Sequence, residues 1–181
     1  LGDNFFYGQN LSRLLLNNTK LTKGAKVVLH KVLKPELFGI AKINKSNKIL
    51  NIKEKPKKFF SDLAITGLYF FDNNVVKYAK KLKPSKRGEV EIVDLLKIYK
   101  SKNQLSADLI GRGGAWLDTG SMDDFYKTST FVSAIENRQG LKIACLEEIA
   151  FNNKWIQKKH LKRSIKFYGN CDYSKYLAKL L

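Results

Sequence analysis

Residues 63–71 restrict the fold of this chain more than any other segment. The sequence there, LAITGLYFF, is the most apolar strand-like run and is rich in β-branched and aromatic side chains, which favour extended strands. Further strand-like and helical segments alternate on both sides of it. Because helices that alternate with strands cover the faces of a sheet, we expect an α/β fold.

The other elements are predicted from periodicity and turn residues. From residue 139 the pattern changes to a loop and two short basic helical segments, at 155–166 and 173–181. We therefore expect a main domain over 1–138 and a small C-terminal helical segment over 139–181. Strands are predicted at 25–33, 38–43, 49–52, 104–110 and 115–117, and helices at 9–18, 89–99, 121–137 and from residue 75 onward.

The chain is strongly basic, with a formal net charge of +18 over 181 residues. A basic surface attracts phosphates, so nucleic acid is one candidate partner. Lysine greatly outnumbers arginine, however, and the lysines are spread along the chain, whereas recognition of bases and phosphates favours the bidentate arginine fork. We therefore expect a small anionic substrate and no nucleic acid.

Hydropathy and cysteine usage bear on where the protein works. No apolar run approaches the roughly 20 residues that a membrane-spanning helix needs, so we expect no membrane partner. Cys145 and Cys171 match no metal or redox spacing and are interpreted as free thiols. Free thiols are typical of a reducing compartment, and a cytoplasmic location is expected.

Two aspartates are candidate metal ligands. Asp3 closes the segment LGD at residues 1–3, interpreted as the end of a buried strand, and Asp118 follows the short strand at 115–117. Ligands of open α/β sheets bind beyond the carboxyl ends of strands, and Mg²⁺ is usually held by one or two carboxylates together with substrate phosphates. The alternative is that Asp3 is a loop or cap residue and Asp118 a turn former before Gly120.

Three further residues suit a sugar phosphate. Glu54 and Lys55 are neighbours that should point to opposite sides of an extended chain, one accepting hydrogen bonds from sugar hydroxyls and the other meeting a phosphate. Arg87 precedes a predicted helix, whose first N–H groups also favour anions. The alternatives are a solvated charge pair and an ordinary exposed turn. Gly39 lies in a predicted strand, where glycine marks either a close approach to a ligand or a packing accommodation.

Taken in chain order, these segments resemble the sugar nucleotidyltransferases over essentially the whole chain. The resemblance implies a Rossmann-like mixed sheet with flanking helices, which is the nucleotide-diphospho-sugar transferase fold. The block at 138–151 favours the class that uses dTTP, although relatives that use other nucleotides share the Glu-Lys-Pro and aspartate elements. The matching segments are 1–8, 38–40, 54–56, 65–72, 82–89, 116–120 and 138–151.

The resemblance also implies a reaction. Members of the family join a nucleoside triphosphate to a sugar 1-phosphate and release pyrophosphate, because a phosphate oxygen of the sugar attacks the α-phosphorus in line. The implied substrates are dTTP and glucose 1-phosphate, and the product is dTDP-glucose for cell-surface polysaccharide synthesis. The implied assembly is a homotetramer.

Site residues carried over from the resemblance fall into three groups. Asp3 and Asp118 would hold the Mg²⁺, and Lys55 and Arg87 would meet the phosphate of the sugar. Glu54 and the backbone at Gly39 would bind sugar hydroxyls, and Ile65 and Thr66 would line the same pocket. Trp116 would pack near the metal aspartate, and Asn4 and Trp116 are also implied to bind substrate. A second, regulatory nucleotide site would involve Arg112, Lys142, Glu148 and Ile149.

One part of the family pattern has no counterpart in these residues. The glycine-rich loop G-G-x-G-T-R-L, which cradles the triphosphate and carries a catalytic arginine, is not found, and the base-recognising residues belong to the same N-terminal third. Loss of that third would expose an edge of the strand at 63–71. We therefore expect this chain alone to be poorly stable and inactive as a transferase. The alternative is a non-catalytic module that binds a sugar phosphate or a regulatory nucleotide and associates with a partner chain.

Overall fold

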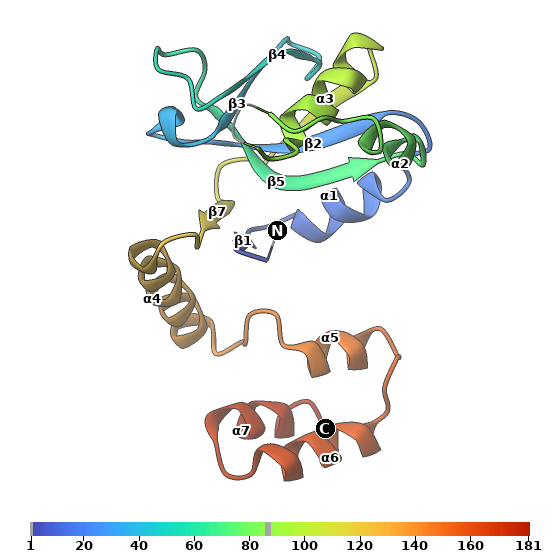
Figure 1. The fold of residues 1–181 in the computed structure, drawn as a ribbon. Helices are drawn as coiled ribbons and strands as arrows, with labels where there is room; N and C mark the ends of the chain where they lie inside the picture. The colour runs from blue at the N-terminus through green and yellow to red at the C-terminus, as the bar shows by residue number, and fades with distance from the viewer. Residues whose placement is uncertain (1, 86–87) are drawn as a thin grey trace. The chain divides into compact units, whose positions relative to one another are not determined.

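The computed structural model describes residues 2–85 and 88–181 (Figure 1). The chain forms two compact units, Leu1–Ser121 and Met122–Leu181. The boundary predicted from the sequence, at residue 138, lies at the far end of the helix that opens the second unit. Each unit is described below by itself.

A five-stranded mixed sheet forms the centre of the first unit. Its strand order is β4-β3-β5-β2-β6, in which β2 and β6 are parallel and all other neighbours are antiparallel. The predicted mixed α/β fold is thereby confirmed. The strands are β2 (Ala25–Lys31), β3 (Gly39–Ile43), β4 (Ile49–Glu54), β5 (Leu63–Phe71) and β6 (Leu105–Leu109).

The central strand β5 is irregular at one place. Its register with β2 shifts between Val27 and Leu29, and Gly67 adopts φ 82, a left-handed conformation that only glycine adopts without cost. The Thr66 hydroxyl donates to the carbonyl oxygen of Val28 at 2.9 Å. A side chain therefore replaces the backbone donor that the bulge removes from the ladder.

The second edge of β5 is paired only at its beginning. Strand β3 meets β5 at Ile40↔Ala64 and Ala41↔Leu63, and beyond Ala64 the structure gives this edge no strand partner within residues 2–85 and 88–181. The edge that the sequence predicts to lack a strand partner is therefore unpaired from residue 65 onward within the described residues, although Ile65 and Thr66 are buried.

Alternation along the strands gives the sheet two buried faces. Val27, Leu29 and Ile65 belong to a core that α3 (Ile92–Ser101) covers with residues such as Leu96 and Tyr99. On the opposite face, Val28, Ile40, Ala64 and Thr66 are also completely buried. Figure 1 shows α3 above the sheet and α1 (Leu11–Asn18) below it. Short helical turns at α2 (Asn74–Ala79) and η1 (Pro35–Leu37) complete the unit.

A separate two-stranded ribbon joins the start of the unit to its end. Strand β1 (Asn4–Tyr7) pairs antiparallel with β7 (Ala115–Asp118). The interpretation of residues 1–3 as the end of a buried strand is wrong for the described residues, because Gly2 and Asp3 form an exposed turn and the strand begins after the acid, at Asn4.

The second unit is helical, with a small core of its own. Its helices are α4 (Met122–Gln139), α5 (Leu146–Asn152), α6 (Lys158–Tyr168) and α7 (Asp172–Ala178). The core consists of Cys145, Leu161, Tyr176 and Leu177. Helix α5 differs from the loop that the sequence predicts here; it is only seven residues long, and its Leu146 and Ile149 are exposed. Phe151 of α5 packs against this core, and Glu147 and Glu148 each accept a hydrogen bond of 2.6 Å from tyrosines of α7.

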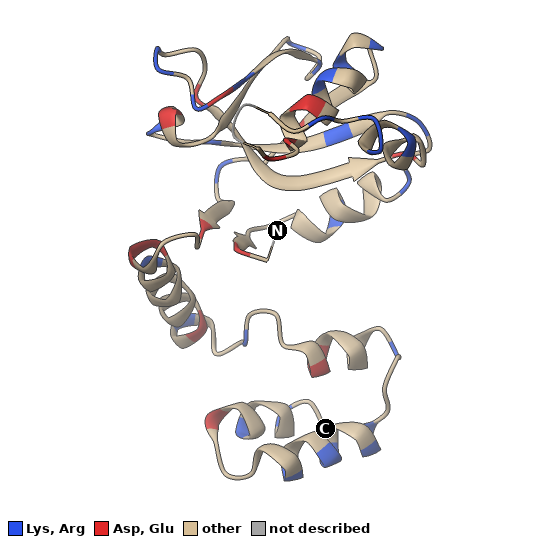
Figure 2. Cartoon of the chain, viewed as in Figure 1, with Lys and Arg blue, Asp and Glu red and all other residues tan. Residues whose placement is uncertain are grey.

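The surface charge is distributed over both units. Figure 2 shows lysines and arginines on many helices, strands and loops, without a single element that collects them. Within residues 2–85 and 88–181, no helix combines the length and the apolar character that crossing a membrane requires. Cys145 and Cys171 are both free, as predicted.

Candidate functional site

The β1/β7 ribbon brings the two candidate metal ligands together. Asn4 pairs with Asp118 across the ribbon, so that Asp3 and Asp118 lie at the same end of it. The backbone N–H and the hydroxyl of Thr119 both donate to the carbonyl oxygen of Asp3, at 2.7 Å and 2.9 Å. Two carboxylates that are far apart in the sequence are thereby held at one place.

Each of these carboxylates uses one oxygen within the protein. Asp3 Oδ1 accepts a hydrogen bond from Asn4 Nδ2 at 3.0 Å, and Asp118 Oδ1 accepts one from the Gly120 N–H at 3.0 Å. In the part of the chain that the structure describes, no cluster of three or more His, Cys, Asp or Glu side chains could hold a metal ion. A donor set of two carboxylates fits Mg²⁺, which retains several waters and completes its shell with substrate phosphates.

A cavity of about 270 Å³ adjoins these carboxylates. Its walls come from five separate parts of the chain: the ribbon, the start of β3 with the residues just before it, the end of β4, the middle of β5 and the start of α3. The lining contains every residue predicted to bind metal or sugar that the structure describes; Arg87 lies outside the described residues. These residues are Asp3, Asn4, Gly39, Glu54, Lys55, Ile65, Thr66, Trp116 and Asp118.

The close approach of β3 to β4 places the Glu54 carboxylate. Gly39 pairs with Glu54 across the two strands, and a Cβ added to Gly39 would lie 3.0 Å from Glu54 Oε2. This distance is shorter than ordinary van der Waals contact. This geometry supports the second interpretation of Gly39, a packing accommodation, because the close neighbour is a side chain of the protein that lines the cavity. A close approach of Gly39 to a ligand stays a prediction.

Lys55 and Glu54 line the same cavity, although the sequence predicts side chains that point to opposite sides of an extended chain. That expectation assumes an extended chain, but β4 ends at Glu54 and Lys55 adopts φ 41. The backbone N–H of Lys55 donates to the carbonyl oxygen of Phe38 at 3.0 Å, which anchors the turn. Residues other than glycine adopt this left-handed conformation at a cost, and such strain clusters at functional sites.

Comparison with known proteins agrees with this geometry. The sequence profile described as "Nucleotidyl transferase" matches residues 1–135. The chain belongs to this family. Among curated relatives of this nucleotidyl transferase chain, the glucose-1-phosphate thymidylyltransferase of Neisseria meningitidis serogroup A is 44% identical over 181 residues. The protein of the same name from Xanthomonas campestris pv. campestris is 42% identical over 180 residues.

The match extends over this chain but not over its relatives. It covers 100% of this chain and 63% of the Neisseria protein, and 99% of this chain and 61% of the Xanthomonas protein. A crystal structure from Bacillus anthracis, described as a glucose-1-phosphate thymidylyltransferase in complex with sucrose, superimposes with a TM-score of 0.63 at 38% identity. It covers 72% of this chain and 52% of the Bacillus chain. The nucleotidyl transferase chain therefore spans less than two thirds of the length of these relatives.

Sequence reasoning did not assign Tyr69 to the site of this nucleotidyl transferase chain, although it lines the cavity. Burial, and after it the neighbouring Glu54 carboxylate, raises the pKa of Tyr69 to about 12. The hydroxyl is therefore protonated at neutral pH and can donate a hydrogen bond to a ligand. The signal in the sequence is alternation: Tyr69 lies four residues after Ile65 in the same strand.

Thr66 is placed at the cavity of the nucleotidyl transferase chain, but with its hydroxyl already engaged. The side chain is completely buried, and its hydroxyl donates to Val28. Thr66 therefore contributes to the wall and to the shape of β5.

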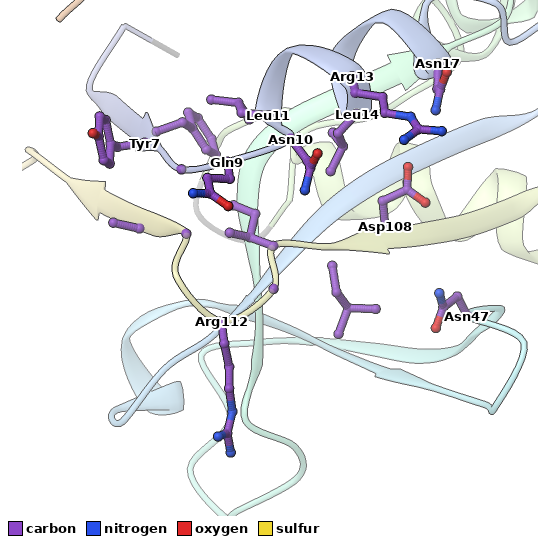
Figure 3. A pocket seen from close by; sticks show the side chains of 17 residues that line it. Tyr7, Gln9, Asn10, Leu11, Arg13, Leu14, Asn17, Asn47, Asp108 and Arg112 are labelled. Carbon is purple, nitrogen blue, oxygen red and sulfur yellow. The ribbon is translucent and has the colours of Figure 1, made fainter.

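A second cavity, of about 550 Å³, contains one of the predicted regulatory residues of the nucleotidyl transferase chain. Arg112 lies in the loop between β6 and β7, and Arg13 of α1 lines the same cavity. In Figure 3 the Arg112 side chain extends away from Asn10 and Arg13. The two arginines therefore do not converge on one point in this structure.

The other predicted regulatory residues belong to the second unit. Lys142 forms an ion pair with Glu136 at 2.6 Å, and Glu148 accepts a hydrogen bond from the Tyr176 hydroxyl at 2.6 Å. Ile149 is exposed on α5. A shared regulatory site of these residues with Arg112 stays a prediction.

Proposed function

We propose that this chain carries the sugar-phosphate and metal half of a site that transfers a thymidylyl group from dTTP to glucose 1-phosphate, giving dTDP-glucose and pyrophosphate. The observation that carries the proposal is the single cavity in which Glu54 and Lys55 adjoin Asp3 and Asp118. The relatives named glucose-1-phosphate thymidylyltransferase support the choice of sugar and nucleotide.

The sugar ring would occupy the part of the cavity between β3, β4 and β5. The Glu54 carboxylate would accept hydrogen bonds from sugar hydroxyls, and the neutral Tyr69 hydroxyl would donate one. Ile65 and Trp116 would supply apolar wall against the ring faces. Polar groups in a mostly apolar cavity fix the orientation of a small ligand.

The phosphate of the sugar would lie toward the ammonium group of Lys55. A sugar phosphate is largely ionised at neutral pH, since its second pKa is about 6, and its oxygen is therefore a nucleophile without a general base. The task of the protein is to hold that oxygen in line with the α-phosphorus of the nucleotide, and such positioning lowers the barrier by converting a bimolecular step into an effectively unimolecular one.

Asp3 and Asp118 would hold a Mg²⁺ ion at the same end of the cavity. Bound there, the ion would neutralise negative charge on phosphate oxygens. The two aspartates suit this role because each has one oxygen engaged by a hydrogen bond, which restricts the carboxylate, and a second oxygen that accepts no hydrogen bond from the described residues.

Calorimetric titration of the chain with glucose 1-phosphate tests the sugar site. We expect Glu54→Gln to weaken binding about tenfold, because hydrogen bonds to a charged acceptor are stronger than those to a neutral one. Glu36→Gln is the matched control, since Glu36 is exposed in η1 and does not line the cavity. Equal affinities of the two variants would contradict the proposal.

A further inference from the structure

A chain of hydrogen bonds runs from the cavity wall to the carboxylate of Asp3. The indole Nε1–H of Trp116 donates to Asn4 Oδ1 at 2.7 Å, and Asn4 Nδ2 donates to Asp3 Oδ1 at 3.0 Å. These contacts cross the β1/β7 ribbon diagonally, because Asn4 pairs with Asp118 and Trp116 lies two residues before Asp118 on the same face.

The first member of this chain is itself held in place. The ring of Trp116 packs edge-to-face against Phe38, with centroids 5.1 Å apart and planes at 60°, and against His30, at 6.3 Å and 61°. Such tilted contacts are favourable geometries for aromatic pairs. The direction of the indole N–H is therefore fixed by residues of two other segments of the first unit.

The order of donors and acceptors leaves Asn4 one orientation. An indole N–H only donates, so the amide oxygen of Asn4 must face Trp116. The amide nitrogen then faces Asp3, where it meets an acceptor. With the amide turned over, two donors would meet at Trp116 and two acceptors at Asp3. Trp116 therefore determines which end of Asn4 reaches the carboxylate.

We propose that Trp116 and Asn4 are positioning residues that orient the Asp3 carboxylate for a divalent metal ion. The proposal rests on the proposed function, in which Asp3 and Asp118 hold that ion. The bond from Asn4 engages Oδ1 of Asp3, so that Oδ2 would be the oxygen that binds the ion, while Thr119 fixes the backbone of Asp3. Residues that hydrogen-bond a metal ligand preserve its orientation and contribute to metal affinity.

Titration of the full chain with Mn²⁺, followed by electron paramagnetic resonance of the free ion, tests this directly. We expect Trp116→Phe, which keeps an aromatic ring and loses the N–H, to weaken Mn²⁺ binding about tenfold. The matched control is Trp155→Phe in the second unit, where Trp155 is 74% exposed; its affinity should equal that of the wild type. Asn4→Ala provides a second route to the same result if the aromatic variant folds poorly.

The two single variants and the double variant separate positioning from general packing. If Trp116 acts through Asn4, the double variant should bind Mn²⁺ as weakly as Asn4→Ala alone, because both substitutions break one chain of bonds. The chain contains two tryptophans, so its ¹⁵N spectrum has two indole signals. Asn4→Ala should shift the Trp116 signal and leave the Trp155 signal unchanged.

The outcomes distinguish this inference from the function on which it rests. If Asp3→Asn abolishes Mn²⁺ binding while Trp116→Phe and Asn4→Ala retain wild-type affinity, the positioning role is overturned and the metal site stands. If Asp3→Asn leaves Mn²⁺ affinity unchanged, or the wild type shows no saturable site, the metal role of Asp3 is overturned together with the positioning role. Additive losses from the two substitutions would also overturn it.

Discussion

At the scale of single residues, two positions at the sugar cavity have backbone arrangements that restrict their side chains. Gly39 leaves only 3.0 Å between an added Cβ and Glu54 Oε2. Lys55 adopts φ 41 directly after β4. Neither arrangement follows from the residue types alone, because Gly-Ile and Glu-Lys indicate neither a close approach nor a left-handed turn. Substitutions at these two positions should therefore act through steric contact or backbone strain, and not only through the loss of side-chain atoms.

We expect Gly39→Ala to weaken glucose 1-phosphate binding about tenfold, with little loss of stability. The new methyl group would displace the Glu54 carboxylate from the sugar. The loss of one hydrogen bond to a charged group corresponds to a loss of affinity of about tenfold. Calorimetric titration measures the affinity. Gly111→Ala is the control, because a Cβ there meets nothing within 4 Å. Unchanged affinity in Gly39→Ala would show that Glu54 does not depend on this close approach.

Two substitutions of Lys55 should have equal effects on binding and different effects on stability. Lys55→Ala and Lys55→Gly both remove the ammonium group and should both weaken glucose 1-phosphate binding. Glycine relieves the left-handed strain, so Lys55→Gly should have a free energy of unfolding higher than that of Lys55→Ala by about 0.5–1 kcal/mol. Urea denaturation measures this difference. The prediction fails if the alanine variant is the more stable of the two.

At the scale of elements, a buried carboxylate ties four segments of the first unit together. Asp72, 6% exposed, accepts hydrogen bonds from the Gly24 N–H at 2.7 Å, the Tyr99 hydroxyl at 2.7 Å and the backbone and side chain of Asn74. These donors belong to the start of β2, to α3 and to α2. Burial alone would raise the pKa of Asp72, but the hydrogen bonds outweigh it and lower the pKa below its ordinary value.

The lowered pKa of Asp72 predicts acid sensitivity. An unfolded aspartate has a pKa of about 3.9, so the stabilisation is complete above about pH 4 and is lost as the pH falls through the lower folded-state value. We expect Asp72→Asn to lower the free energy of unfolding by about 2 kcal/mol at neutral pH, because an amide cannot accept from all these donors. The difference from the wild type should shrink in acid. Denaturation series at several pH values test both statements, and a difference independent of pH would contradict them.

Hydrophobic periodicity predicts the elements correctly where the packing of their side chains follows the same period. The strand at 63–71 was predicted with the bounds that the structure gives it, and β2, β3 and β6 within two residues at either end. Helix α5 was missed because it has only seven residues and is held by contacts to other segments, from Phe151 to the core and from Glu147 and Glu148 to tyrosines of α7. Strand β1 was missed because four residues are too few for a periodic signal, and its partner β7 lies far along the sequence.

At the scale of the whole molecule, each unit has its own apolar core and its own tryptophan. Leu96 is completely buried in the core of the first unit, and Leu161 in that of the second. Trp116 lies in the first unit and Trp155 in the second. Separate cores allow the two units to unfold as separate cooperative steps.

We therefore expect each core substitution to act on one unit. Leu96→Ala should lower the free energy of unfolding that Trp116 fluorescence reports by about 3 kcal/mol. Leu161→Ala should lower the free energy of unfolding that Trp155 fluorescence reports by about the same amount. In a Trp155→Phe background the tryptophan fluorescence reports only on Trp116, and in a Trp116→Phe background it reports only on Trp155. Equal shifts of both reporters by either substitution would show a single cooperative transition instead.

The membership of the cavity was largely predictable, and its internal arrangement was not. The resemblance to sugar nucleotidyltransferases named Glu54, Lys55 and Trp116 in advance, and all three line the cavity. The sequence could not show that Lys55 leaves the extended conformation directly after β4, since that depends on one backbone angle. Nor could it show the bond from Trp116 to Asn4, which joins residues 112 positions apart.

The β1/β7 ribbon also sets the order in which the site can form during folding. Asp3 and Asp118 meet only when residues 115–119 return to the start of the chain, so closing this long loop costs more chain entropy than forming any neighbouring hairpin of the sheet. Two strands of four residues are marginal without further support. We therefore expect the carboxylate pair to be assembled after the sheet, so that metal binding reports the final step by which the first unit becomes native.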